Sequence, residues 1–208
     1  MQKIDLHNKT VLVTGSAGFI GSNLVLELLK TQSPINIIGI DNLNDYYDVS
    51  IKNWHLSEID KCVSLHPEST YTFIKGDISD KSVIDHIFLE YKPSVVVNLA
   101  AQAGVRYSIT NPDAYIQSNL IGFYNILEAC RHSYDNGETG VEHLVYASSS
   151  SVYGSNKKVP YNTDDKVDNP VSLYAATNLE QDYGFKPNTS LRNGLRKFAE
   201  WYKEFYMA

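Results

Sequence analysis

Three glycines stand close together near the start of the chain, in the segment T-G-S-A-G-F-I-G of residues 14–21. Gly15, Gly18 and Gly21 come after a short β-branched run and open an apolar pattern with helical spacing. In such a place one glycine permits a tight turn, one lets the main chain approach a pyrophosphate, and one allows a helix to pack closely on a sheet. The helix N-terminus then offers N–H groups to phosphates. Glycines also serve as plain turn formers, so this interpretation depends on the residues further along the chain.

A carboxylate stands where a dinucleotide site needs one. Asp41 ends a second apolar run twenty residues after Gly21, and there it can hold both ribose hydroxyls of an adenosine. Its negative charge would repel a 2′-phosphate, so the spacing favours NAD over NADP. Asp77 comes after a third apolar run in G-D-I, where the adenine would lie, although an Asp in a loop is also a common helix N-cap.

The rest of the chain supplies elements that would position these residues. Short apolar runs predict buried strands, and longer patterns with helical spacing predict helices. The strands are expected at residues 9–14, 35–40, 71–74, 94–99 and 143–147, and the helices at 18–29, 82–91 and 113–132. Continuous apolar strands that alternate with helices are typical of a parallel sheet covered on both faces. We therefore predict an α/β fold, a doubly wound parallel sheet with helices on both faces.

Two later segments have other patterns. Residues 151–170 are polar and rich in turn formers, as an active-site loop after a strand would be. Near the end of the chain, Thr189 or Ser190 could cap a last amphipathic helix. The apolar face of that helix would consist of Leu191, Leu195, Phe198, Tyr202 and Phe205.

Composition excludes several classes of function. The 208 residues carry 24 acidic and 18 basic side chains, a net charge of −6, so no basic excess exists to bind nucleic acid or an anionic membrane. The sequence contains neither an apolar leader segment nor an apolar run long enough to span a membrane. The 2 cysteines are far apart and the 6 histidines show no metal-ligand spacing, so we expect no disulfide framework and no metal site. We expect a soluble, cytoplasmic protein.

Further motifs carry a family resemblance. They are V-T-G-S-A-G-F-I-G, I-D-N-L-N-D-Y-Y-D, K-G-D-I-S-D, N-L-A-A-Q-A-G-V-R-Y-S, S-N-L-I-G-F-Y-N-I-L-E-A-C-R, Y-A-S-S-S-S-V-Y-G and P-V-S-L-Y-A-A-T, over about residues 9–177. The chain resembles extended short-chain dehydrogenases/reductases, specifically NAD-dependent nucleotide-sugar epimerases, and most closely UDP-glucuronate 4-epimerases. The resemblance implies a Rossmann-like domain, tightly bound NAD and a UDP-sugar substrate, with UDP-glucuronate and UDP-galacturonate as the expected pair.

The resemblance also implies roles for single residues. Ser149, after the fifth strand, and Tyr174 would be catalytic. Arg106, in A-G-V-R-Y-S, would lie along the sugar-nucleotide cleft and could pair with an anionic substrate group, or it could be a plain surface arginine. The implied substrate contacts are Arg106, Ser149 and Ser150. The implied NAD contacts are Gly15, Gly18, Phe19, Ile20, Gly21, Asp41, Asn42, Asp77, Ile78, Leu99, Ala100, Ala101, Asn119 and Tyr174.

The implied reaction is a transient oxidation at C4 of the sugar. A tyrosinate at Tyr174 would remove the proton of the sugar O4 while NAD takes the hydride from C4, and the hydride would return to the opposite face of the keto sugar. Ser149 would donate a hydrogen bond to O4. Family dehydratases and decarboxylases usually carry an acid three residues before the glycine of the V-Y-G motif, where this chain has Ser151. That difference favours an epimerase over either alternative.

The chain departs from the family pattern after residue 177. The family reads Y-x-x-x-K, and the lysine lowers the pKa of the tyrosine, but Asn178 occupies the lysine position here. The residues after it resemble the far C-terminal end of the same epimerases. We therefore expect residues 1–177 to form the NAD-binding domain and residues 178–208 to be a remnant of the substrate-binding region, which is largely missing. An internal deletion after Thr177 could be natural, engineered or an omitted segment.

This departure leaves two alternative functions open. The chain could be an inactive NAD-binding remnant of the family, or a dimerising module that uses its long helices. Family members pair through the helix that begins near Asp113 and the helix that bears Tyr174, so a homodimer is expected in either case.

Overall fold

The computed structural model describes residues 4–135, 140–158, 160–162 and 164–182. They divide into two compact units. The first consists of residues 1–102 and 113–147 as far as they are described, and the second of residues 103–112 with the described part of 148–208. None of the helices in these ranges has the length and the apolar run needed to cross a bilayer.

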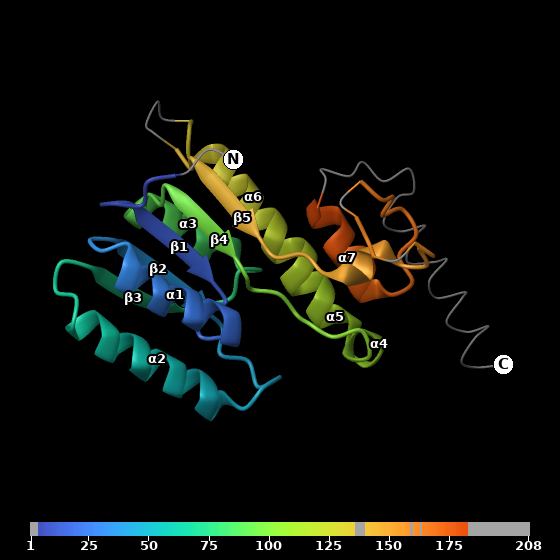
Figure 1. Ribbon diagram of the computed structural model, residues 1–208, viewed down its shortest axis with the longest axis horizontal. Helices are drawn as coiled ribbons and strands as arrows, with labels where there is room; N and C mark the ends of the chain where they lie inside the picture. Colours follow the sequence, from blue (N-terminus) through green and yellow to red (C-terminus); the bar gives the residue numbers. More distant parts are fainter. Residues whose placement is uncertain (1–3, 136–139, 159, 163, 183–208) are drawn as a thin grey trace. The chain divides into compact units, whose positions relative to one another are not determined.

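The first unit is built on a parallel sheet, as the sequence predicts (Figure 1). Its strands are β1 (Thr10–Thr14), β2 (Asn36–Asp41), β3 (Thr70–Lys75), β4 (Val95–Asn98) and β5 (His143–Tyr146). The spatial order is β3-β2-β1-β4-β5, and every neighbouring pair is parallel. The chain winds outward from β1 in both directions, so the order reverses between β1 and β4. In open α/β sheets, ligands bind outside the carboxyl ends of the strands at such a switch point.

Helices cover both faces of this sheet (Figure 1). They are α1 (Phe19–Thr31) and α2 (Val49–Ser64) on one face, and α3 (Lys81–Tyr91) and α6 (Phe123–His132) on the other. Alternation along β1 divides the core: Val11 and Val13 pack with α1 and α2, whereas Leu12 packs with α3 and α6. Each fully buried aliphatic side chain contributes about 1.5–3 kcal/mol relative to an exposed one, and this burial is what holds the layers together.

The helix α2 was not predicted from the sequence. Its apolar periodicity is weak, because its buried side contains Lys52 and His55 besides Ile59 and Cys62. Asp48 caps its N-terminus by accepting a hydrogen bond from the main-chain N–H of Ser50 at 2.8 Å. A helix with polar groups on its inner side does not show the apolar stripe that a pattern search detects.

The predicted helix over residues 113–132 is confirmed as a continuous helical segment, but it is not α-helical throughout. The segment consists of α5 (Pro112–Tyr115), a π-helix η1 (Ile116–Gly122) and then α6. Within the π-helical segment, a Cβ on Gly122 would lie only 2.5 Å from Cγ1 of Ile78, so the helix passes very close to the loop after β3. π-Helical turns often occur at functional sites.

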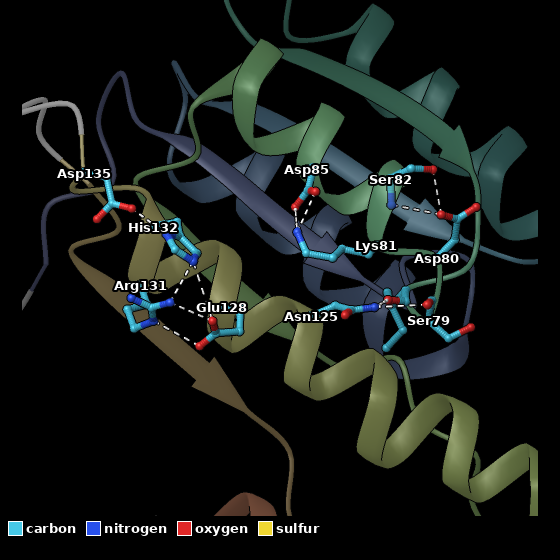
Figure 2. Close-up of polar contacts among 11 residues, drawn as sticks. Ser79, Asp80, Lys81, Ser82, Asp85, Asn125, Glu128, Arg131, His132 and Asp135 are labelled. Atoms are coloured by element: carbon cyan, nitrogen blue, oxygen red, sulfur yellow. Dashed lines mark hydrogen bonds and ion pairs between the residues drawn. The ribbon is translucent and has the colours of Figure 1, made fainter.

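Polar contacts join α6 to the segment that precedes α3 (Figure 2). The side-chain amide of Asn125 donates to the main-chain oxygens of Ile78 and Ser79, at 3.0 Å in both cases. Asp80 then caps α3 by accepting from the main-chain N–H of Ser82 at 2.9 Å. These bonds hold the loop after β3 at the carboxyl end of the sheet.

The second unit is smaller and has short elements. They are α4 (Tyr107–Thr110), a 3₁₀ turn η2 (Ser150–Tyr153) and α7 (Leu173–Asp182), with α7 packed against the other two. The predicted loop over 151–170 is ordered by a ring stack between Tyr153 and Tyr161, at 4.5 Å, and by an ion pair between Lys158 and Asp165. The predicted helix after Thr189 or Ser190 lies outside the described residues, as does most of the segment 178–208.

Candidate functional site

The glycine-rich loop connects β1 to α1 at the switch point of the sheet. Gly15 has a φ of +66°, and a Cβ there would lie 2.9 Å from the main-chain nitrogen of Ala100. A Cβ on Gly21 would lie 2.2 Å from the carbonyl oxygen of Gly15, so only glycine lets α1 approach its own loop this closely. Gly18 caps α1 and has no side chain to occupy the first turn. The main-chain N–H groups of Ser16, Ala17 and Gly18 are bonded within the fold, so those of the first turn of α1 are the ones placed to meet an anion.

The predicted cofactor residues Phe19 and Ile20 form the first turn of α1. Their side chains are 77% and 63% exposed. Exposed apolar side chains are an energetic cost that a ligand can relieve by covering them. Both residues thus lie at the start of the helix that the sequence predicts after the glycines.

Thr14 joins the ends of β1 and β4 and was not singled out in the sequence. Its buried hydroxyl donates to Oδ1 of Asn98 at 2.7 Å and accepts from the main-chain N–H groups of Leu99 and Ala100 at 3.1 and 2.9 Å. The predicted cofactor residues Leu99 and Ala100 are thereby held beside the glycine-rich loop. Ala101, also predicted, is next in the chain and is exposed.

Asp41 lies at the carboxyl end of β2, as predicted, and organises the neighbouring loop. Its Oδ2 accepts from the main-chain N–H of Ala17 at 3.2 Å, and its Oδ1 accepts from that of Leu43 at 2.8 Å. Nζ of Lys52, from α2, approaches Oδ1 to 3.3 Å, and both side chains are about nine-tenths buried. His55, also from α2, contacts the carbonyl oxygen of Ala17 through Nδ1 at 2.8 Å. Lys52 and His55 were missed in the sequence, because α2 was not recognised as a helix.

Asn42 and Asp77 meet at the carboxyl ends of β2 and β3. The side-chain amide of Asn42 donates to Oδ2 of Asp77 at 2.8 Å, and the main-chain N–H and hydroxyl of Ser79 donate to Oδ1 at 2.8 and 2.7 Å. Burial alone would raise the pKa of Asp77, but these hydrogen bonds outweigh it and lower the pKa below its ordinary value. Ile78 is buried in the core, so only its main chain can reach a ligand.

Asn119, on the π-helix η1, is fully buried and holds the chain after β4. Its Oδ1 accepts from the main-chain N–H of Gln102 at 2.8 Å, and its Nδ2 donates to the carbonyl oxygen of Gln102 at 3.1 Å. The side-chain Nε2 of Gln102 is buried and has no hydrogen-bond partner among the described residues. A buried amide nitrogen without an acceptor is a position that a ligand can satisfy. Gln102 was not selected from the sequence.

Tyr71 supports the glycine-rich loop from β3. Its hydroxyl reaches across Gly39 to donate to Oγ of Ser16 at 3.2 Å. A Cβ on Gly39 would lie 2.4 Å from that hydroxyl, so this crossing requires glycine in β2. Burial raises the pKa of Tyr71 to about 12, although the hydrogen bond with Ser16 opposes part of the rise.

The predicted catalytic residues lie in the second unit. Ser149 precedes the turn η2, and its Oγ accepts from the main-chain N–H and the hydroxyl of Ser151, at 3.3 and 3.0 Å. Tyr174 is half-buried in the first turn of α7, and Asn178, one turn later, donates from Nδ2 to the carbonyl oxygen of Tyr174 at 2.7 Å. The predicted substrate residues Ser150 and Arg106 are exposed, in η2 and just before α4. The predicted cofactor and catalytic sets thus fall into different units, apart from Tyr174.

Comparisons with known proteins agree with this fold. The family model described as GDP-mannose 4,6 dehydratase matches residues 12–196, and the chain belongs to this family. The resemblance to the short-chain dehydrogenase/reductase epimerases is confirmed by curated relatives that include UDP-glucuronate 4-epimerases and by solved epimerase structures.

Three similar proteins show how much of the chain is shared. Protein CapI of Staphylococcus aureus is 45% identical over 193 residues, which are 91% of this chain and 53% of that protein. UDP-glucuronate 4-epimerase 4 of Arabidopsis thaliana is 44% identical over 168 residues, 81% of this chain and 35% of that protein. The crystal structure of UDP-glucose 4-epimerase from Bifidobacterium longum in complex with NAD+ and UDP matches with a TM-score of 0.65 and 25% identity, and covers 83% of this chain and 47% of that chain. The chain spans about half the length of the first of these relatives and less of the others.

Proposed function

We propose that the chain binds NAD at the carboxyl ends of β1, β2 and β4. The observation that carries this proposal is the tight glycine-rich loop at the switch point, with the bare N-terminus of α1 on one side and the carboxylate of Asp41 on the other. Gly15, Gly18 and the first turn of α1 would hold the pyrophosphate, and Asp41 would hold the adenosine ribose. The amide nitrogen of Gln102, which has no partner in the described part of the chain, and the exposed Phe19 and Ile20 fit a site that a ligand completes.

Titration calorimetry with NAD tests the binding proposal. We expect saturable binding by the whole chain, and a large loss of affinity in Gly18→Glu, which would place a carboxylate beside the pyrophosphate. The exposed control Glu27→Gln, in the middle of α1, should bind as the unchanged chain does. Absence of NAD binding in the unchanged chain would contradict the proposal.

We further propose that the full activity is the 4-epimerisation of a UDP-sugar, with UDP-glucuronate and UDP-galacturonate as the pair. NAD, when bound, would supply the hydride acceptor and donor for this reaction. Tyr174, ionised to the tyrosinate, would take the proton of the sugar O4 and later return it, and Ser149 would hold that oxygen by a hydrogen bond. The 44% identity with a UDP-glucuronate 4-epimerase supports this substrate class. Ser151, in place of the acid expected in a dehydratase, supports epimerisation over elimination.

A coupled assay for UDP-galacturonate formation tests the activity. We expect turnover above that of Tyr174→Phe, which keeps the ring and removes the hydroxyl that carries the proton. Turnover equal to that of the Phe variant would contradict the proposed activity, while NAD binding could still stand.

The second candidate function is an NAD-binding remnant without turnover, and Asn178 favours it. The family resemblance places a lysine at this position, and a cation one turn after Tyr174 would lower the pKa of the phenol. Asn178 instead donates to the main chain of Tyr174 and brings no charge. If this candidate is correct, the unchanged chain is inactive and Asn178→Lys raises the turnover. A chain already active with Asn178 would contradict it.

We also propose that the chain forms a homodimer through α6 and the π-helix that precedes it. Ile121, Tyr124 and Leu127 lie on this continuous helical segment and are 41–56% exposed, an apolar strip that a second copy would cover. Light scattering at increasing protein concentration should give a dimer mass, and Leu127→Glu should lower it to that of the monomer. A monomer at all concentrations would contradict the proposal.

A further inference from the structure

Lys52 changes the electrostatics of the Asp41 site. From the sequence alone, a single carboxylate at the end of β2 repels a 2′-phosphate and favours NAD over NADP. The structure pairs that carboxylate with a buried ammonium group 3.3 Å away, and the same ammonium donates to Oδ1 of Asn44 at 3.1 Å. The two formal charges cancel, so the site does not carry the net negative charge on which the preference for NAD over NADP relies.

The pair is held from several sides. Lys52 stands in the first turns of α2, and its side chain is only 10% exposed. His55, one turn later on the same helix, contacts the carbonyl oxygen of Ala17, while Asp41 accepts from the N–H of Ala17. The helix α2 is therefore joined both to the carboxylate and to the glycine-rich loop. Lys52 can leave for solvent only by giving up its contacts with Asp41 and Asn44.

We propose that Lys52 is a second determinant of cofactor choice, a phosphate-binding cation that Asp41 neutralises in the unchanged chain. This inference rests on the proposed NAD site. A buried ammonium group that loses its carboxylate is left without charge compensation, which is costly. A phosphate on the ribose 2′-oxygen, the position that Asp41 would otherwise contact, restores the ion pair. The choice between NAD and NADP thus depends on the pair rather than on Asp41 alone.

Three variants test this inference by calorimetric titration of the whole chain. The probes are NAD, NADP, AMP and adenosine 2′,5′-bisphosphate, so the readout does not depend on turnover. Asp41→Asn should raise the affinity for NADP and for the bisphosphate at least tenfold relative to the unchanged chain. Lys52→Met should lower the ratio of NADP to NAD affinity at least tenfold, because it leaves the carboxylate uncompensated.

The double variant D41N/K52M is the decisive one. It contains neither buried charge, so it keeps the test valid if Lys52→Met alone does not fold. It should lose the gain in NADP and bisphosphate affinity that Asp41→Asn produces. Lys61→Met, an exposed lysine on the same helix, is the matched control and should leave all four affinities unchanged.

Two negative results are distinguishable. The inference is overturned if D41N/K52M binds NADP as tightly as Asp41→Asn does, or if Asp41→Asn gains no affinity for NADP, because Lys52 is then no phosphate ligand. NAD binding by the unchanged chain would in that case still support the proposed function. If the unchanged chain and all variants bind none of the four probes, the proposed function and this inference both fail.

Discussion

At the scale of single residues, the site is built from side chains that each make several contacts. Asp41 accepts from Ala17, Leu43 and Lys52, and a carboxylate has about four acceptor positions, so one remains for a ribose hydroxyl. Tyr71 is a second example, since one hydroxyl supports the glycine-rich loop from two strands away through Ser16. Such residues shape the loop before any ligand arrives.

The raised pKa of Tyr71 gives a prediction about alkaline stability. The folded-state pKa of about 12 lies above the ordinary value of 10.0, so the folded chain holds the proton more tightly than the unfolded chain. The stability from Tyr71 is fully present below pH 10 and is lost as the pH rises toward 12. Between pH 9 and pH 11, the free energy of unfolding should fall by roughly 1.4 kcal/mol more in the unchanged chain than in Tyr71→Phe.

Chemical denaturation at several pH values measures this difference. Tyr71→Phe also loses the hydrogen bond to Ser16 at every pH, so only the change with pH counts. Tyr47→Phe, at a ring that is 62% exposed, serves as the control and should behave as the unchanged chain does. Parallel pH curves for the unchanged chain and Tyr71→Phe would refute the prediction.

At the scale of elements, the site depends on how neighbouring strand ends are joined. Thr14 connects β1 to β4, Asn42 connects β2 to the loop after β3, and Asn119 connects the π-helix to the chain after β4. Each of these contacts is made by a polar side chain at a strand end or on the π-helix, near the carboxyl edge of the sheet. The core clusters provide most of the stability, and these polar contacts set the shape of the site.

Thr14→Val tests one of these polar contacts. Valine has the same shape but no hydroxyl, so Asn98 loses a donor and the N–H groups of Leu99 and Ala100 lose their acceptor. We expect a loss of about 2–3 kcal/mol in the free energy of unfolding, measured by urea denaturation. Thr14→Ser keeps the hydroxyl and removes one methyl, so it should lose only about 1 kcal/mol. Equal losses in the two variants would show that the hydroxyl contributes nothing.

At the scale of the whole molecule, the predicted functional residues are divided between two units. The loop, Asp41 and Asp77 belong to the first unit, and Ser149 and Tyr174 belong to the second. The chain also spans only about half the length of relatives such as CapI. The proposed NAD binding and the proposed turnover are therefore tested separately. NAD titration measures the binding, and the UDP-galacturonate assay measures the turnover.

Bound NAD should stabilise the chain and slow hydrogen exchange at the residues that it contacts. At a free concentration of about 100 times the Kd, the free energy of unfolding should rise by about 2.7 kcal/mol. Hydrogen exchange measured by mass spectrometry should show slower exchange over residues 14–21 and 41–43, and over 149–154 if Ser149 and Tyr174 share the ligand. Unchanged exchange over 14–21 would contradict the NAD site itself.

The sequence by itself determined the class of fold and most of the candidate site. Glycine spacing, Asp41 at the end of a strand, Asp77 just after one, and apolar runs are local signals, because main-chain geometry and burial impose them on residues close in the chain. Tertiary structure alone decided the rest. Lys52, Thr14 and Tyr71 act on partners 8 to 86 positions away, and no local pattern encodes such contacts. Gln102 is distinguished by a buried amide nitrogen that has no partner in the described part of the chain. Since the charge next to Asp41 comes from a helix whose buried side is partly polar, only the folded chain shows that this carboxylate is paired.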